Sequence, residues 1–518
     1  MALDPIALKT PYTPEWWMDT LAKRMLDRSR LLRFGILEAY RAGCPPLVTA
    51  TESQRTTFQA FNRVSRSNFA RPVVRALVER LAVRAIRTAA VNDDAGDSVA
   101  WRYWTGCGLN IAAPDVHSDM GTFSEAVVRV GVRADGSPVA LRRDPRYVVT
   151  EQDPFDPLRT IAALELMWDP ITSTDYALLW LPGEEHVATR ERKTKPPTFQ
   201  VPGILAEDRR QARLPWFPRL SFEPSQFTMR PNVDDVPEEL RDSAPYSRTL
   251  DQPVVPVVRL TNRDGVGEFE EHLDLIDCIS FLDMLLNVVG GVQAYKQRSL
   301  QQDANDGQDR LPDKNPNTGE PINWDEIFQP GPDALWKLPP GVTIHESGQV
   351  DMQGLLSAIE SKIKRLSTLT NTPFALLSDD VNQSAEGAQA KREGLVLKVE
   401  DRQDIAGFFW PQVMSLVLSF APEADRYDAN GNDRADAGRM IFDWKPADRP
   451  SLAEKAGADA QNKTLSVDMA AQKIWGLTPD EVAINRAQKS SDALLAAALA
   501  PAPAPQGSPT GGNPVPAA

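Results

Sequence analysis

Three carboxylates lie close together in a polar stretch near the middle of the C-terminal half. Asp379 and Asp380 are followed six residues later by Glu386. Clustered carboxylates are typical Mg²⁺ ligands, so the cluster raises the hypothesis of a metal-dependent nuclease. The alternative is a solvated loop that caps a helix, because Ser384 suits an N-cap and Glu386 would then fall in the first helical turn. We favour the capping interpretation.

Other residues that could do chemistry are scattered. The chain has no phosphate-binding glycine loop, no dinucleotide-binding glycine motif, no zinc-protease motif and no nucleophile elbow. Neither the histidines nor the cysteines have metal-ligand or disulfide spacing, which favours core or surface histidines and buried free thiols. They are His117, His186, His272, His345, Cys44, Cys107 and Cys278. The sequence therefore predicts a protein that is not an enzyme and has no metal and no cofactor.

Composition narrows the class of protein. The 518 residues are 42% hydrophobic and carry a net charge of −14, which argues against a protein whose main role is to grip phosphates through a basic face. No window of 18 apolar residues and no secretory leader is present, so we expect a cytosolic protein without a membrane-spanning segment.

Hydrophobic periodicity predicts an α+β protein. The spacing predicts a helix from Pro14 to Gly43 and a second helix over residues 70–87. After Phe123 the period becomes that of antiparallel strands, with Asp135-Gly136 as a hairpin turn. The proline-rich residues 184–258 are expected to form loops with short strands such as "PVVPVVRL".

Two helices are predicted to flank an inserted subdomain. Helical spacing resumes at Glu268 and is expected to end at Gly290-Gly291, and a second helix begins at Asp351 and ends before Pro373. The intervening segment of about sixty residues is too long for a plain loop and contains the short strands "ALWKL" and "VTIHE".

A very long helix follows, from Ser384 to Phe420, and would span about 55 Å. Pro411 is expected to kink it. We expect such a helix to be poorly buried by itself, so that it needs neighbours from the same chain or from copies in a ring or bundle. Its apolar stripe is Leu395, Val399, Phe409, Val413, Leu416 and Phe420.

The order of these elements resembles that of the portal proteins of tailed bacteriophages, particularly the branch common in phages of actinobacteria. The resemblance covers about Glu15 to Asn485 and is carried by four segments. They are "EEHLDLIDCISFLDMLLNVVGG", "ALWKLPPGVTIHESG", "SAIESKIKRLSTLTNTPFALLSDDVNQSAEGAQAKREGLVLKVEDRQ" and "DWKPADRPSLAEKAGADAQNKT".

The resemblance implies a portal fold in which the chain is divided into named regions. These are a wing (1–267), a first stem helix (268–290), a clip (291–350), a second stem helix (351–370), a tunnel loop (371–383), a long wing helix with its following segment (384–449), a crown (450–500) and a disordered tail (501–518).

The resemblance also implies a function at one vertex of a virion capsid, after assembly in the host cytoplasm. Twelve copies, or thirteen when overexpressed, would form a ring through which double-stranded DNA is packaged and ejected. The implied partners are the terminase large subunit, a head-completion adaptor, and the major capsid and scaffolding proteins, with no membrane. A shorter head–tail adaptor that also passes DNA is the alternative, and a metal-dependent nuclease is a weaker one.

Three groups of site residues follow from this resemblance. The tunnel-loop residues are expected to approach the DNA backbone without reading bases, and the basic residues to offer transient phosphate contacts or to pair with carboxylates of a neighbouring subunit. Trp336 is either an exposed anchor for partners or a core residue. The groups are Asp379, Asp380, Asn382 and Gln383 in the loop, Lys362, Lys364 and Arg365 on the stem, and Trp336, Lys337 and Val342 in the clip.

Overall fold

The computed structural model combines helices and sheets, which confirms the mixed α+β class. Its strand pairs are antiparallel throughout the named sheets of the described chain. The structure describes residues 10–46, 64–92, 96–133, 135–157, 159–201, 218–238, 241, 245–250, 252–294, 298–302, 314, 318–321, 342–346, 351–377, 385–448, 452–477 and 479–499.

The first predicted helix is two helices, α1 (Pro14–Met25) and α2 (Arg28–Arg41). The break falls at Asp27, whose carboxylate accepts hydrogen bonds from the backbone N–H groups of Ser29 at 3.0 Å and Arg30 at 3.2 Å. An aspartate in this position satisfies the free N–H groups of a new helix, so it restarts the chain in another direction.

The second predicted helix is wrong in its second half. Helix α4 covers Ala70–Val78, and Val83–Arg87 forms strand β1, which pairs with β13 (Ile441–Trp444). Ala85 and Ile86 are buried in this pairing, so tertiary packing overrides a helical pattern that continued through the segment. Two helices that the sequence reading did not identify follow, α5 (Ser98–Gly106) and α6 (Leu109–Phe123).

Two antiparallel sheets make up the β-rich part. The larger sheet contains β4 (Val148–Gln152), β5 (Thr160–Asp169), β6 (Thr174–Leu181), β7 (Glu184–Glu191) and β8 (Thr228–Met229), with β9 (Arg248–Thr249) also on β7. The smaller sheet contains β10 (Val257–Thr261), β2 (Glu125–Val132) and β3 (Pro138–Arg143).

Two predictions about these strands have different outcomes. The Asp135-Gly136 turn lies between β2 and β3 as expected, and Gly136 has a φ of +80°, where glycine is favoured. The expectation of loops and short strands after Glu184 is wrong for β7, an eight-residue strand within the larger sheet. Its Val187 and Ala188 are almost fully buried, because both faces of that sheet are covered.

Four layers are stacked in the body of the protein. The larger sheet packs on α1 through side chains such as Leu164 and Leu179, and on the smaller sheet through Ala163 and Trp180. Adjacent residues of one strand point to opposite faces, so a strand buried on both sides becomes a continuous apolar run. The far face of the smaller sheet packs on α6 and α11 (Ala385–Ser419).

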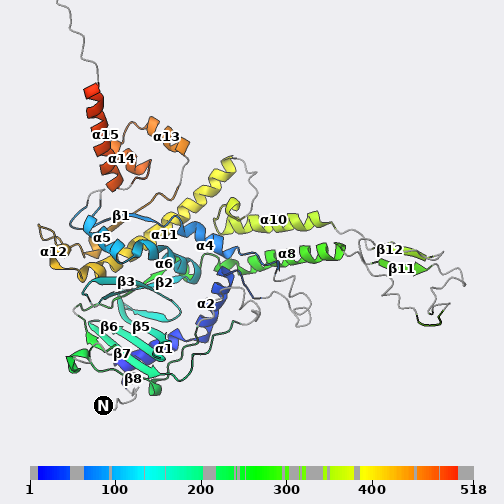
Figure 1. Ribbon diagram of the computed structural model, residues 1–518, viewed down its shortest axis with the longest axis horizontal. Helices are drawn as coiled ribbons and strands as arrows, with labels where there is room; N and C mark the ends of the chain where they lie inside the picture. Colours follow the sequence, from blue (N-terminus) through cyan, green and yellow to red (C-terminus); the bar gives the residue numbers. More distant parts are fainter. Residues whose placement is uncertain are drawn as a thin grey trace, which may run out of the picture.

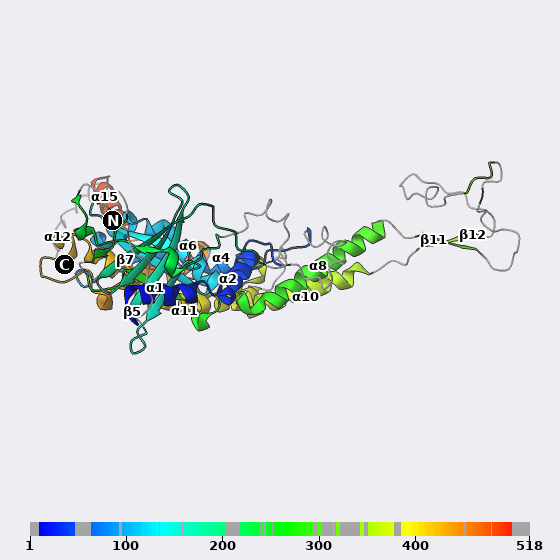
Figure 2. The same cartoon turned by 90° about the horizontal axis from the view of Figure 1, so that it is seen from below.

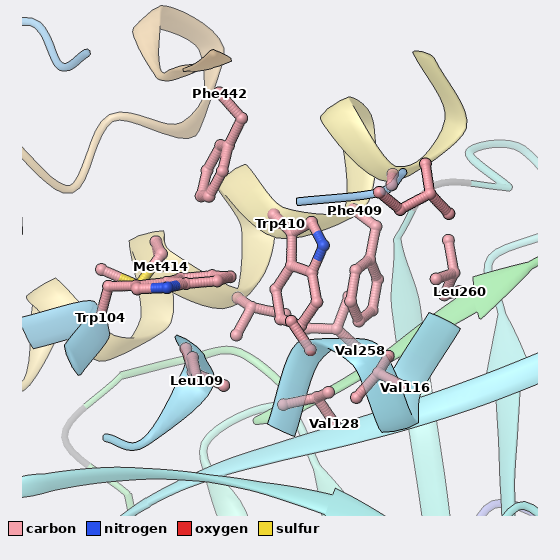
Figure 3. Close-up of a cluster of buried hydrophobic side chains, with 14 of the residues drawn as sticks. Trp104, Leu109, Val116, Val128, Val258, Leu260, Phe409, Trp410, Met414 and Phe442 are labelled. Atoms are coloured by element: carbon pink, nitrogen blue, oxygen red, sulfur yellow. The ribbon is translucent and has the colours of Figure 1, made fainter. Parts of the chain in front are cut away.

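Helix α11 has nearly the predicted bounds and contains Pro411, and of the two expected sources of neighbours the same chain supplies those around its middle. Trp410 and Val413 are fully buried, and Phe409 is 3% exposed. Figure 3 shows Trp410 and Phe409 among side chains from α5, α6, the smaller sheet and β13. The helix is therefore buried within one chain, because its middle lies in the largest hydrophobic cluster of the described body.

A long arm projects from this body (Figures 1 and 2). It consists of α8 (Leu273–Ala294), strands β11 (Arg298–Gln302) and β12 (Val342–Glu346), which pair, and the returning α10 (Met352–Leu369). The expected helix end at Gly290-Gly291 is wrong, because α8 runs through both glycines to Ala294. Glycine weakens a helix interior by only about 1 kcal/mol per residue, and Gly290 lies against Met352 of α10, so packing carries the helix through both glycines.

Short elements and the C-terminal helices complete the described chain. The remaining α-helices are α12 (Glu423–Arg426), α13 (Leu452–Gln461), α14 (Val467–Lys473) and α15 (Pro479–Leu499), the last three lying apart at one end of the body (Figure 1). The 3₁₀ turns are η1 (Pro224–Gln226), η2 (Val233–Asp235), η4 (Arg263–Gly265), η5 (Glu270–His272), η6 (Phe374–Leu376) and η7 (Ala437–Arg439).

Candidate functional site: the helical arm and its junction with the body

Helix α8 is apolar on every side but is covered only in part. Ile276 and Ile279, near the body, are at most 1% exposed, and Met284 is 5% exposed. Phe281 is 40% exposed, and the side chains from Leu285 to Val289 are half-buried or exposed. A helix with apolar residues all round is normally buried all round. The described residues therefore leave apolar surface on this arm uncovered.

Helix α10 packs on α8 through one stripe. Ile359 and Leu366 are buried and Ile363 packs beside them, while Leu356 and Leu369 are 46% and 48% exposed. Asp351 caps the helix by accepting a hydrogen bond from the backbone N–H of Gln353 at 2.9 Å, as the predicted start of this helix requires. The arm is thus a two-helix hairpin with one shared apolar seam.

The three basic residues of α10 do not share one side of the helix. At about 100° per residue, Lys362 and Arg365 lie about 60° apart, whereas Lys364 lies about 160° from Lys362. Lys364 makes an ion pair with Glu360, and its Nζ lies 5.6 Å from the centre of the Phe374 ring. Within the described chain, Lys362 and Arg365 have no ion pair, and Arg365 is exposed.

Glu268, a buried carboxylate whose side chain is 3% exposed, ties the chain just before α8 to α11, beside the apolar cluster in which α8 packs on α2 and α4. Its Oε2 lies 2.7 Å from Lys398 Nζ and its Oε1 lies 2.8 Å from Arg402 Nε, both on α11. Asn262 Nδ2 donates a third hydrogen bond to Oε1 at 3.0 Å. We call Glu268, Lys398 and Arg402 the junction triad. It joins the chain at the base of α8 to α11.

Electrostatics at the junction triad favour the charged form of the carboxyl. Burial by itself would raise the pKa of Glu268, but the positive charges and hydrogen bonds of Lys398 and Arg402 outweigh burial and hold that pKa below its usual value of 4.5. Arg402 also pairs with Asp401, which in turn pairs with Arg263. The network therefore continues from the buried junction to the surface.

The end of α10 is fastened to the same triad. Lys398 Nζ also donates a hydrogen bond to the backbone carbonyl of Thr370 at 2.9 Å. Beyond it, the chain turns at Asn371, which has a φ of +50°, and Ser367 Oγ donates to the carbonyl of Thr372 at 2.7 Å. Phe374 is 1% exposed. Both ends of the arm are thus held at one place, and residues 371–377 form a compact, anchored turn.

Several predicted site residues fall outside this geometry. Asp379, Asp380, Asn382, Gln383, Trp336 and Lys337 lie outside the described residues, as does the side chain of Glu386. Val342 begins β12 and pairs in register with Gln302. Among the described residues, no three or more His, Cys, Asp or Glu side chains are grouped so as to hold a metal ion. No described helix combines the length and the apolar character needed to cross a bilayer.

The junction triad was missed by the sequence reading, although a signal for it was present. Lys398 and Arg402 are four residues apart and flank Val399 of the predicted apolar stripe. Two cations beside a buried stripe need a partner, because a buried charge is stable only when paired. Which carboxylate supplies that partner could not be read from spacing, since Glu268 comes from a distant part of the sequence.

Comparison with known proteins gives distant structural similarities. No family model and no curated protein matches the chain. It is similar to a chain in the virion of a native gene transfer agent particle, with a TM-score of 0.37, 11% identity and coverage of 83% of this chain and 95% of that one. It is also similar to a chain in the neck of an empty gene transfer agent particle, with a TM-score of 0.37, 12% identity and coverage of 83% and 94%.

A crystal structure of an HK97-family phage portal protein from Corynebacterium diphtheriae is a further similar structure. The TM-score is 0.32 at 12% identity, over 78% of this chain and 100% of that one. The chain is thus similar to solved structures of a phage portal protein and of gene transfer agent particles. With TM-scores below 0.5, these similarities by themselves assign no function.

Proposed function

We propose that this chain is the subunit of a portal, a ring at one capsid vertex of a tailed-phage-like particle through which double-stranded DNA enters and leaves. In this proposal the arm helices are the stem, the β11–β12 region is the clip, and the body with α11 is the wing. The C-terminal helices α13–α15 are the crown. The observation that carries the proposal is an arm of two helices, α8 and α10, which projects from the body and whose apolar surface the described residues cover only in part.

Ring assembly would complete the burial of the arm. Phe281 on α8 and Leu356 and Leu369 on α10 each leave about half of their surface in water. Arms of neighbouring copies set side by side around an axis would cover these side chains, and burying apolar surface stabilises association by about 25 cal/mol per Å². A contact between two different faces of the same chain closes into a ring when its rotation divides a full turn.

The proposed channel would hold DNA loosely. Helix α8 has 22 residues and would line about 33 Å of the channel, opposite about 20 phosphates at one charge per ~1.7 Å of duplex. Against these, α10 offers Lys362 and Arg365 on one side, and the whole chain has a net charge of −14. Few cations on an acidic protein favour DNA that slides. Asp379, Asp380, Asn382 and Gln383 are proposed to lie beside the backbone without reading bases.

Partners would dock at the two ends of the ring. We propose that the clip, with Trp336, Lys337 and Val342, binds the terminase large subunit during packaging and a head-completion adaptor afterwards. The body is proposed to contact the major capsid and scaffolding proteins. Deleting residues 303–317 from the clip is expected to weaken terminase binding while rings still form. Unchanged terminase binding by such rings would contradict that role.

Imaging and mass measurement of the purified chain test the ring itself. We expect closed rings of twelve copies, or thirteen on overexpression, with a central channel wide enough for duplex DNA. A folded monomer at every salt and protein concentration tried would overturn the proposal. An open or short-stemmed ring would instead favour the alternative, a head–tail adaptor.

DNA handling has its own test, built on the two sides of α10. Reversing both free cations, Lys362→Glu with Arg365→Glu, is expected to reduce DNA packaging or retention in filled heads. Lys364→Glu is the matched control, because Lys364 already pairs with Glu360 within the chain. Rings of the double variant that package and retain DNA normally would remove these residues from the mechanism. Loss of the rings themselves would assign the pair to contacts between subunits.

A further inference from the structure

An apolar groove lies on the outer side of α11. Two adjoining cavities, of about 530 and 200 Å³, have Arg159, Gln412 and Ala437 in common as lining residues. Apolar side chains form most of the remaining lining, and Phe408 among them is 50% exposed. They include Phe408, Pro411 and Met440 of the first cavity and Val254, Val255 and Leu416 of the second. We call this the α11 groove.

Arg159 carries the positive charge at the mouth of the groove, where Asp156 also lines the first cavity. Arg159 is exposed and lines both cavities. In the part of the chain that the structure describes, its guanidinium has neither an ion pair nor a hydrogen bond. An apolar groove with a free arginine at its rim fits an apolar side chain that has a carboxylate beside it.

Such a side chain protrudes from the opposite end of strand β5. Ile171, in the turn between β5 and β6, is 91% exposed. The preceding Asp169 accepts hydrogen bonds from the backbone N–H of Ile171 at 2.8 Å and from Thr172 Oγ1 at 2.7 Å. Pro170 lies between them and restricts the turn further. The turn thus holds an apolar tip and an adjacent carboxylate in a fixed arrangement, and no described cation pairs with Asp169.

The ionised state of Asp169 fits this role. Its hydrogen bonds from Thr172 and from the backbone N–H of Ile171 lower its pKa below the usual value, so it is charged at neutral pH. A preorganised turn also loses little conformational entropy when it binds, and that loss is a main penalty of association.

We propose that the Ile171 turn of one copy seats in the α11 groove of the next copy, with Asp169 against Arg159. This inference rests on the proposed ring, and it identifies one of the contacts that would close it. The two surfaces lie at opposite ends of β5, whose ten residues span about 33 Å. Groove and tip are therefore well separated on each copy. Two distinct surfaces on opposite sides give the head-to-tail contact from which rings are built.

Charge reversal with rescue is the first test. Arg159→Asp alone and Asp169→Arg alone place like charges at the contact, so each is expected to raise the protein concentration for half-assembly about tenfold. The variant with both changes restores the opposite charges and is expected to assemble like the wild type. Both residues are at the surface, so far-ultraviolet circular dichroism should show an unchanged fold in all three variants.

The outcomes of this test separate the contact from the ring. Assembly of both single variants at the wild-type concentration, or failure of the double variant to recover, would overturn the contact while leaving the ring in place. A wild-type chain that stays monomeric would overturn the proposed function and this inference with it.

Cross-linking is the second test, and it reports geometry directly. Ile171→Cys combined with Phe408→Cys is expected to give a ladder of dimers, trimers and higher species on mild oxidation, because each copy then carries a donor and an acceptor site. The matched control is Ile111→Cys with Phe408→Cys, since Ile111 is also exposed, at 77%, but lies on α6 away from the turn. A ladder in the control would show that cross-linking at Phe408 does not depend on the Ile171 turn. No ladder in the test variant when rings are present would show that the Ile171 turn of the next copy does not occupy the groove. Either result would overturn the contact.

Discussion

Removing the carboxylate of Glu268 should destabilise the body and release the arm together. Glu268→Ala leaves Lys398 and Arg402, with side chains 9% and 13% exposed, without their shared partner. Breaking a buried ion pair by removing one partner typically costs about 3–5 kcal/mol, because the remaining charge is buried and uncompensated. Lys398 loses its one carboxylate partner among the described residues, whereas Arg402 keeps Asp401, so we expect a loss at the lower end, about 3 kcal/mol.

The assay for this change is urea unfolding, followed by circular dichroism, of wild type, Glu268→Ala and Glu268→Gln. Glutamine keeps the shape and one acceptor, so its loss should be smaller than that of alanine. Glu271→Gln is the matched control, because this exposed neighbouring carboxylate has no ion pair among the described residues; its effect should lie within about 0.5 kcal/mol. Exchange of the backbone amide hydrogen at Thr370 should also become faster, because Lys398, which donates a hydrogen bond to the Thr370 carbonyl, loses its ion pair with Glu268.

Acid should remove the same stabilisation. The folded-state pKa of Glu268 lies below its usual value of 4.5, so its contribution is fully present above that value and is lost as pH falls through the folded-state pKa. A loss below about 1 kcal/mol in Glu268→Ala would refute the reasoning. So would additive effects of Glu268→Ala and Lys398→Met, because groups that interact directly should show a coupling of about 0.5–3 kcal/mol.

Three further predictions concern the body. Burial lowers the pKa of His117 to about 4, so between about pH 6.5 and 4 the unfolded state binds more protons than the folded state. As pH falls through this range, the wild type should lose up to about 3 kcal/mol of unfolding free energy relative to His117→Gln. Urea unfolding at each pH measures the difference. Trp410→Ala should cost about 3–5 kcal/mol in chemical unfolding, equally at low and high protein concentration, because its cavity is inside one chain. A Cβ at Gly267 would lie 2.5 Å from the carbonyl oxygen of Thr122, so Gly267→Ala should lower the melting temperature. Gly106→Ala is the control, because a Cβ there meets nothing within 4 Å, and it should leave the melting temperature unchanged or raise it.

Elements with a strong period were predictable from the sequence. The bounds of α10 and α11 differ from the predicted ones by one or two residues, because both have long amphipathic patterns. The Asp135-Gly136 turn was also correct, since its residues suit a hairpin. By contrast, Val83–Arg87 continues a helical pattern and becomes a strand only because β13, far along the sequence, supplies its partner.

The source of the cover over α11 could not be predicted for the same reason. Its apolar stripe was identified correctly, but the sequence does not state which surface covers a stripe. The cover comes from α5, α6 and the smaller sheet, which lie between residues 98 and 261, so the same chain, one of the two expected sources, covers the middle of the helix. The two helices of the arm were predictable from the sequence. The junction triad was not, because its members are far apart in the sequence and come together only in the folded chain.

The positions of the junction triad and of its neighbouring elements in the sequence determine when the body can finish folding during synthesis. Strand β1 near the N-terminus pairs with β13, and α11 fills the core beside them, so the whole arm has to leave the ribosome before the body can close. Pairings between residues so far apart in sequence fold slowly, and the unfinished body exposes strand edges and apolar faces meanwhile. The nascent chain is therefore expected to depend on chaperones until residue 444 is made. Because Glu268 and Lys398 hold both ends of the arm together, residues at its far end, between β11 and β12, are expected to be gained or lost while the body keeps its fold.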